Sequence, residues 1–163
     1  GRLDDERETQ HHAATTADTL KAAGFNLNLA PVVDLDANPD NPIIHGKRRS
    51  FSADPEVVAR HAAAFVGAHR ARGVLTCAKH FPGHGSARGD THLGLVDVTA
   101  SWTERELEPF RTLAATGLAD MIMTAHVFNA RLDADHEFRR SDPGFDGAHA
   151  HAFDHARNRA QLF

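Results

Sequence analysis

The sequence predicts an α/β fold in which parallel strands alternate with helices. Strand-like and helix-like segments take turns with a period of about 45 residues, a pattern typical of βα units. Each strand-like segment also ends in polar residues: Asp34, then Lys79 and His80, then Thr124 and His126. Active sites of (β/α)8 barrels and of open doubly wound sheets both lie at the carboxyl ends of the strands. The alternation alone therefore leaves these two folds open.

Composition limits the class of protein. The 163 residues are 41% hydrophobic and 25% charged, which suits one globular unit with its own core. A formal net charge of −4 with no basic block argues against a nucleic-acid partner. No apolar run approaches the roughly 18 residues of a membrane span, and the N-terminal region carries no signal-peptide core. The single cysteine, Cys77, lies among apolar residues and is expected to be a buried packing residue.

Over residues 9–51, glycines and prolines mark the ends of the predicted helix, strand and loop. A helix is expected over residues 9–23, closed by Gly24, and an extended, mostly apolar strand over residues 25–34. Residues 35–51 form a loop rich in Pro, Asn and Asp, and a loop of this length often has a function or is disordered. Asp34, at the end of the strand, is expected either to line a pocket or to cap a neighbouring backbone group.

The region after residue 53 starts with a clear helix signal. Asp54 is placed to cap a helix that begins at Pro55, runs to about residue 72 and stops at Gly73. A strand over residues 74–80 follows. TERE, residues 103–106, has the pattern of a capping box and should open a helix that ends near Gly117, before a strand over residues 121–127.

The loop KHFPGHGSARGDTH, residues 79–92, carries the candidate chemistry. Lys79 and His80 stand where a strand ends, so they can present fixed donors to a cleft. Asp90 and His92 are two residues apart, close enough for the carboxylate to bind one imidazole nitrogen while the other faces a substrate. That pairing orients the ring and makes His92 a candidate general acid/base.

Three other interpretations of this loop stay open on spacing alone. It could be a solvated polar loop, or a phosphate cradle, although the Gly-Lys-Ser/Thr ending of a Walker motif is absent. A metal site is the third, with the ligands His80, His84, Asp90 and His92. Against the metal site, Pro82 and Gly83 prevent a helix from placing the first two histidines on one face.

The same loop resembles the signature K-H-F-P-G-H-G-x4-D-[ST]-H of the bacterial β-N-acetylglucosaminidase branch of family 3 glycoside hydrolases. Three further segments resemble this family: NLAPVVDLDANPDNPII (28–44), RSFSADPEVV (49–58) and IMTAHVFNARLD (122–133). The resemblance implies a (β/α)8 barrel, and hence a partial TIM barrel over residues 1–140, with parallel strands and helices at about the third to fifth positions.

The resemblance also implies site residues and a substrate. Arg49, Lys79 and His80 match sugar-binding positions, and Asp90 with His92 matches an Asp-His acid/base dyad. His126, at the end of the next strand, is expected either to line the same site and bind substrate or to be a structural histidine with its hydrogen bonds satisfied. The implied partner is a carbohydrate with a terminal β-linked N-acetylglucosamine, from peptidoglycan fragments or chitooligosaccharides, hydrolysed with retention and without a cofactor or metal.

The C-terminal part departs from the family pattern. GFDG at residues 144–147 resembles the start of the nucleophile segment, but no paired acids follow, and Asp154 is the nearest carboxylate. Residues 141–163 are therefore treated as an atypical tail, either disordered or frame-shifted. The chain is expected to be a fragment that is inactive alone.

Two rival functions remain from the sequence: a degenerate sugar-binding module without a nucleophile, and a zinc-dependent hydrolase, supported only by the number of histidines. Cytoplasmic location is what the resemblance implies, and export stays open.

Overall fold

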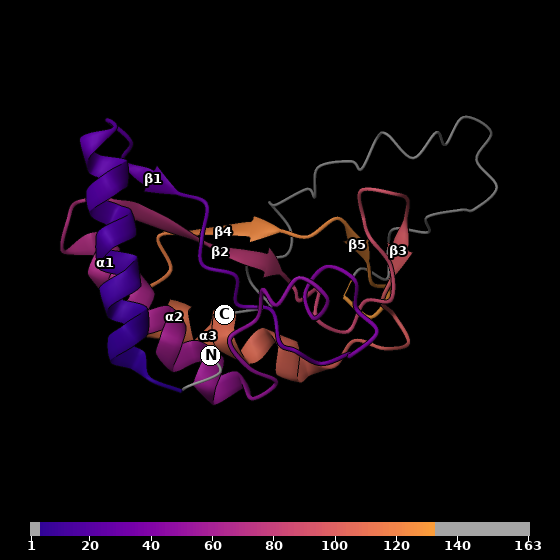
Figure 1. Cartoon of the computed structure of the whole chain (residues 1–163). Helices are drawn as coiled ribbons and strands as arrows, with labels where there is room; N and C mark the ends of the chain where they lie inside the picture. The colour runs from indigo at the N-terminus through magenta and orange to yellow at the C-terminus, as the bar shows by residue number, and fades with distance from the viewer. Residues whose placement is uncertain (1–3, 133–163) are drawn as a thin grey trace.

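The computed structural model describes residues 4–132. Its centre is a parallel three-stranded sheet in the order β1-β2-β4, formed by β1 (Leu27–Asn28), β2 (Leu75–Phe81) and β4 (Met121–Thr124). The predicted alternation of helices with parallel strands is confirmed. Because all three strands run the same way, the residues after β1, β2 and β4 come to the same edge of the sheet, as predicted (Figure 1).

The first strand is shorter than predicted. Only Leu27–Asn28 forms a regular strand, and an isolated bridge pairs Val32 with Lys79 farther along. Pro31 lies between them and has no N–H to donate to the ladder, which accounts for the break. The segment nevertheless stays beside β2, because its carbonyl groups at Ala30 and Pro31 accept from the β2 backbone at 2.9 and 3.1 Å.

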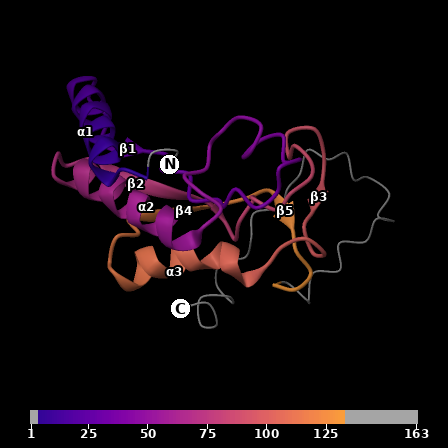
Figure 2. The ribbon, with the colours of Figure 1, turned by 60° about the horizontal axis from the view of Figure 1, so that its bottom comes forward.

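Three helices pack on one face of this sheet (Figures 1 and 2). Helix α1 (Glu6–Ala22) begins three residues before the predicted start at Thr9, because Asp5 caps it by accepting from the Arg7 N–H at 2.9 Å. Helix α2 (Pro55–Arg70) has the predicted Asp54 cap and lies between α1 and α3. It ends two residues before the predicted position, and Gly73 follows with a φ of 69°.

The third helical segment corrects the capping-box prediction. It opens as a 3₁₀ turn, η1 (Glu104–Leu107), and continues as α3 (Glu108–Ala115), followed by Gly117 with a φ of 68°. Thr103 makes no side-chain cap bond. Glu106, the other half of the predicted box, accepts from the Ser86 N–H at 3.2 Å.

Two apolar clusters hold the layers together. The larger lies between the sheet and helices α2 and α3 and contains Val33, Leu35, Val58, Ala62, Ala78, Phe110 and Leu113. Cys77 of β2 is buried and free, as expected. The smaller cluster lies at the loop end and contains Ala87, Val96, Val98, Trp102 and Leu107.

A second, two-stranded sheet was not predicted. β3 (Val96–Asp97) pairs in parallel with β5 (Val127–Phe128), so the predicted strand over residues 121–127 divides into β4 and β5. The backbone N–H of Ala125 donates to the carbonyl oxygen of Phe81 at 2.6 Å where β4 ends. Over the described range, no helix is long and apolar enough to cross a bilayer.

Candidate active site

Asp34 is the organising residue at the carboxyl edge of the sheet. Its side chain is fully buried, and its carboxylate accepts from the backbone N–H of His84 at 2.8 Å and from that of His80 at 3.2 Å. The Nδ1 of His80 lies 2.7 Å from Oδ2 of the same carboxylate. Because a carboxylate only accepts, His80 donates from Nδ1, and its Nε2 is left to face a ligand. Of the two predicted roles of Asp34, the capping role is confirmed.

Lys79 and His80 are therefore fixed before any ligand arrives. Lys79 is paired within the sheet with Met123 of β4 and with Val32, and the register shifts between Lys79 and Phe81. The peptide bond between Lys79 and His80 is cis. Burial, and then the positive charge of Arg49, lower the pKa of Lys79 below its ordinary value. Arg49 thus lies within electrostatic reach of Lys79, which supports their convergence on one site.

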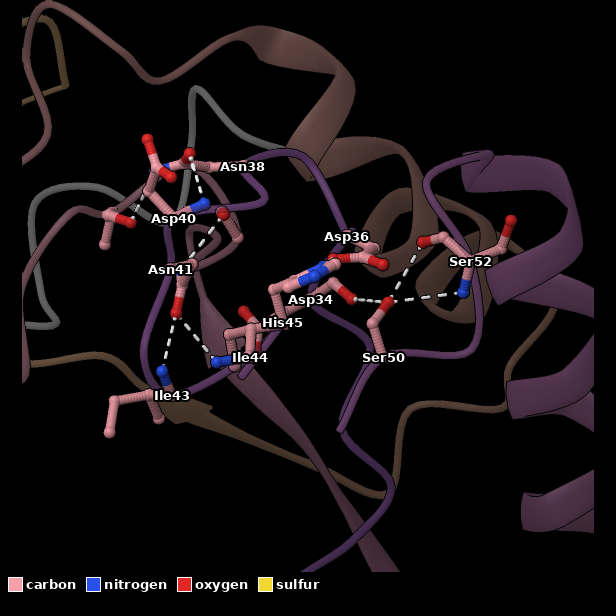
Figure 3. Close-up of polar contacts among 12 residues, drawn as sticks. Asp34, Asp36, Asn38, Asp40, Asn41, Ile43, Ile44, His45, Ser50 and Ser52 are labelled. Carbon is pink, nitrogen blue, oxygen red and sulfur yellow. Dashed lines mark hydrogen bonds and ion pairs between the residues drawn. The ribbon is translucent and has the colours of Figure 1, made fainter. Parts of the chain in front are cut away.

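The long loop after β1 is ordered by asparagine and serine side chains (Figure 3). Asn41 is buried, and its amide oxygen accepts from the backbone N–H groups of Ile43 and Ile44 at 2.9 and 2.7 Å. Its amide nitrogen donates to the carbonyl oxygens of His84 and Gly85 at 2.7 and 3.1 Å. One side chain therefore turns its own loop and joins it to the loop after β2.

Two further contacts complete this junction. The amide of Asn38 donates to the carbonyl oxygen of Ala87 at 3.0 Å. Gly85 lies so close to the backbone of Leu35 that a Cβ on Gly85 would collide with the Leu35 carbonyl oxygen. Near Arg49, the hydroxyl of Ser50 donates to the carbonyl oxygen of Asp34 at 2.6 Å, as Figure 3 shows.

The predicted Asp90–His92 pair is present. His92 Nδ1 lies 2.7 Å from Asp90 Oδ1, and the backbone N–H of His92 donates to the same oxygen at 2.9 Å. These two bonds, the backbone one first, lower the pKa of Asp90, and the charge of Lys47 adds to the effect. The imidazole is 81% exposed. A ring oriented by an ionised carboxylate, with its other nitrogen free to exchange protons, is suited to acid/base work.

A second Asp–His pair lies on the neighbouring loop. His45 Nδ1 is 2.8 Å from Asp36 Oδ1, and both side chains are partly exposed (Figure 3). This pair, whose partners are nine residues apart, was not predicted from the sequence. The two pairs have nearly the same bond length, so the bond alone does not distinguish a reactive pair from a surface contact.

His84 is buried at this edge of the sheet, whereas His126 is exposed. His84 is 4% exposed, its two ring nitrogens have no hydrogen-bond partner within residues 4–132, and burial lowers its pKa. His126 is exposed and lies between β4 and β5, so its expected role in lining the sugar site stays a prediction. Asp154, the GFDG segment and the tail over residues 141–163 lie outside the described residues.

The geometry does not favour the metal-site interpretation. Within the described part of the chain, no group of three or more His, Cys, Asp or Glu side chains is arranged to hold a metal ion. Of the four candidate ligands, His80 binds Asp34 while Asp90 and His92 bind each other.

Comparison with known proteins identifies the family. The sequence profile described as the glycosyl hydrolase family 3 N-terminal domain matches residues 2–147. The chain belongs to glycoside hydrolase family 3. Within this family it is 41% identical over 124 residues to beta-hexosaminidase A of Pseudoalteromonas piscicida, and the match covers 74% of the chain and 20% of that protein.

Solved family 3 structures agree with the fold. A β-N-acetylglucosaminidase from Paenibacillus sp. superposes with a TM-score of 0.74 at 36% identity, over 80% of the chain and 25% of that structure. NagZ from Neisseria gonorrhoeae, in complex with N-trifluoroacetyl-D-glucosamine, gives a TM-score of 0.69 at 36% identity, over 78% of the chain and 37% of NagZ. The chain thus spans well under half the length of these family 3 relatives.

Two residues that contact the loop after β2 had no useful sequence signal. Asn41 lies in a Pro/Asn/Asp-rich loop in which any polar residue suits the composition, and only its contacts with His84 and Gly85 set it apart. The sequence predicts Glu106 as part of a helix cap, whereas it is 1% exposed and contacts the loop after β2 at Gly83 and Ser86.

Proposed function

We propose that the full-length protein containing this chain hydrolyses terminal β-linked N-acetylglucosamine from oligosaccharides, with Asp90 and His92 as its acid/base dyad. The observation that carries the proposal is the position of the Asp90–His92 pair, joined by a contact of 2.7 Å, on the same loop that presents Lys79 and His80. Peptidoglycan fragments and chitooligosaccharides are the proposed sources of the sugar, and cytoplasmic action is part of the proposal.

The roles of the dyad follow from its geometry. Asp90 accepts from Nδ1, so Nε2 of the protonated ring donates to the glycosidic oxygen as the bond to the leaving group breaks. The negative charge of Asp90 stabilises the imidazolium before this transfer. Once the leaving group departs, Nε2 is free to take a proton from the attacking water, as retention requires.

Sugar recognition is assigned to Arg49, Lys79 and His80. Long cationic donors and an imidazole can hydrogen-bond the ring hydroxyls. His80 presents Nε2 because Asp34 occupies its Nδ1, and Arg49 lies within electrostatic reach of Lys79. The attacking carboxylate of the retaining mechanism is not assigned to a described residue, since the resemblance places it in the C-terminal segment.

A substitution at His92 tests the proposal. His92→Ala should lower kcat/KM by about 10²–10⁴-fold on an alkyl or disaccharide substrate, the usual range for positioned acid/base catalysis. The loss should be much smaller on a nitrophenyl β-N-acetylglucosaminide, whose leaving group departs without a proton. Kinetics on both substrates give the comparison.

The neighbouring pair supplies the matched control. His45→Ala removes an imidazole with an almost identical aspartate contact, at 2.8 Å, and should change neither rate appreciably. Equal losses in the two variants, or equal losses on both substrates in His92→Ala, would contradict the assignment. Sugar binding without turnover in the unmodified protein would favour the degenerate binding module instead.

A further inference from the structure

Glu106 is a buried carboxyl that the proposed mechanism does not use. It lies in η1, is 1% exposed, and accepts from the backbone N–H of Ser86 through Oε2 at 3.2 Å. Its Oε1 has no hydrogen-bond partner within residues 4–132. Burying a carboxyl costs free energy, and among the described residues Glu106 forms no ion pair, so its presence here requires a reason.

The side chain of Glu106 lies directly against the catalytic loop. A Cβ on Gly83 would lie 2.5 Å from the Glu106 Cβ and 2.8 Å from its Oε2, so only glycine fits at this position. The indole N–H of Trp102, just before η1, donates to the carbonyl oxygen of Pro82 at 3.0 Å. The segment from Trp102 to Glu106 therefore contacts the loop at three points, Pro82, Gly83 and Ser86.

The two ends of the loop differ in how they are held. The upstream end has the pairing of β2 with β4 and the bonds from His80 and His84 to Asp34. The downstream end, which leads to Asp90 and His92, is held by Glu106 at Ser86 and by Asn38 at Ala87. Loss of the Glu106 contact should therefore free the downstream end more than the upstream end.

We propose that Glu106 is a positioning residue for the acid/base dyad, because its carboxyl oxygen fixes the Ser86 backbone from which the segment to Asp90 and His92 extends. This inference rests on the proposed function of the dyad. Glu106 acts through the loop and touches no substrate. The proposed role depends on whether the Glu106 carboxyl oxygen reaches the Ser86 N–H and accepts its hydrogen bond, and it does not depend on the negative charge.

The electrostatics support a role that needs no charge. Burial raises the pKa of Glu106, the nearby Asp34 adds to the rise, and hydrogen bonds from Ser86 oppose it. A neutral carboxyl still accepts from the Ser86 N–H through its carbonyl oxygen.

Two conservative variants separate reach from charge. Glu106→Asp keeps the charge but shortens the side chain by one methylene, which withdraws the oxygen by about 1.5 Å from Ser86. Glu106→Gln keeps the reach and an accepting oxygen but removes the charge. The readout is the ratio of kcat/KM on a nitrophenyl β-N-acetylglucosaminide to kcat/KM on an alkyl β-N-acetylglucosaminide, measured in the full-length protein.

The ratio excludes a purely structural explanation, because a smaller folded fraction lowers both rates equally. A displacement of about 1 Å can cost about 10²-fold in rate. Glu106→Asp should therefore raise the ratio by about tenfold or more, since only the alkyl leaving group needs the proton. In Glu106→Gln the ratio should stay within about threefold of the wild-type ratio. Glu104→Asp, a substitution at an exposed position of the same η1 turn, should leave the ratio at the wild-type value.

Three outcomes would overturn the inference. An unchanged ratio in Glu106→Asp would show that the dyad does not depend on this contact. A ratio in Glu106→Gln raised as much as in Glu106→Asp would show that the negative charge is required in addition to the reach, which contradicts a role that needs no charge. A raised ratio in Glu104→Asp would show that the readout is not specific to the buried carboxyl. His92→Ala distinguishes failure of the Glu106 inference from failure of the proposed function. If His92→Ala leaves the ratio unchanged, the proposed acid/base function of the dyad itself fails.

Discussion

Replacing Asp34 with asparagine removes the charge that holds His80 and His84 at the start of the loop after β2, with almost no change in side-chain shape. In the native protein Oδ1 accepts from the His84 N–H at 2.8 Å and Oδ2 from the His80 ring at 2.7 Å. Asparagine has one accepting oxygen and one NH₂ group. Whichever way the amide is turned, its NH₂ faces one of these two donors.

The expected magnitude follows from this loss. At least one buried hydrogen bond to a charged acceptor disappears, and its donor is left unpaired. Such a change costs roughly 2–4 kcal/mol, which Asp34→Asn should lose from the free energy of unfolding. Displacement of the loop carrying His80 should also lower kcat/KM about 10²-fold, with a raised KM because His80 is a sugar-binding candidate.

Urea unfolding and steady-state kinetics of the full-length protein test both parts. Asp36→Asn is the matched control, because it makes the same change two residues along in the exposed pair with His45, where the cost should be about 0–1 kcal/mol. If the free energy of unfolding of Asp34→Asn lies within about 0.5 kcal/mol of the wild-type value, or if the variant retains the wild-type kcat/KM, the assignment of an organising role to Asp34 is wrong.

Two further substitutions test other parts of the structure. Lys79→Ala should raise KM for the aryl substrate about tenfold or more, because sugar hydroxyls lose a donor, and an unchanged KM would remove Lys79 from the sugar site. At Asp120, burial opposes ionisation, but hydrogen bonds from Arg70 and Thr76 outweigh it and lower the pKa. Its stabilising effect is therefore present above the ordinary aspartate pKa of about 3.9 and lost as the pH falls through the lower, folded value. Asp120→Asn should cost about 1–3 kcal/mol in urea unfolding at pH 7 and progressively less below pH 4, whereas an equal cost at both pH values would contradict the assignment.

Local signals predicted the parts of the fold that depend on neighbouring residues. Asp54, Pro55 and Gly73 marked the ends of α2 to within two residues, because capping and the backbone preferences of Pro and Gly act within one turn. The Asp90–His92 pair was predictable for the same reason, since its partners are two residues apart.

Long-range pairing accounts for what the sequence did not predict. β3 and β5 are two-residue strands about 30 positions apart, too short to leave a hydrophobic pattern. Thr103 and Glu106 fit a capping box locally, but the Thr103 side chain makes no cap bond, and Glu106 accepts from the backbone of Ser86, 20 residues earlier. Asn41 reaches His84 across 43 residues, a distance over which composition carries no information.

The contacts of Asn41, Asn38 and Gly85 bear on how this scaffold can be re-engineered. The loop over residues 35–52 and the loop over residues 81–95 share hydrogen bonds and a backbone contact that admits no side chain at Gly85. A grafted loop with a different backbone path would remove the carbonyl groups that the buried amide of Asn41 contacts, and one without glycine at position 85 would place a Cβ against Leu35. Altering substrate preference by loop exchange therefore requires both loops to be transferred together from the same homologue.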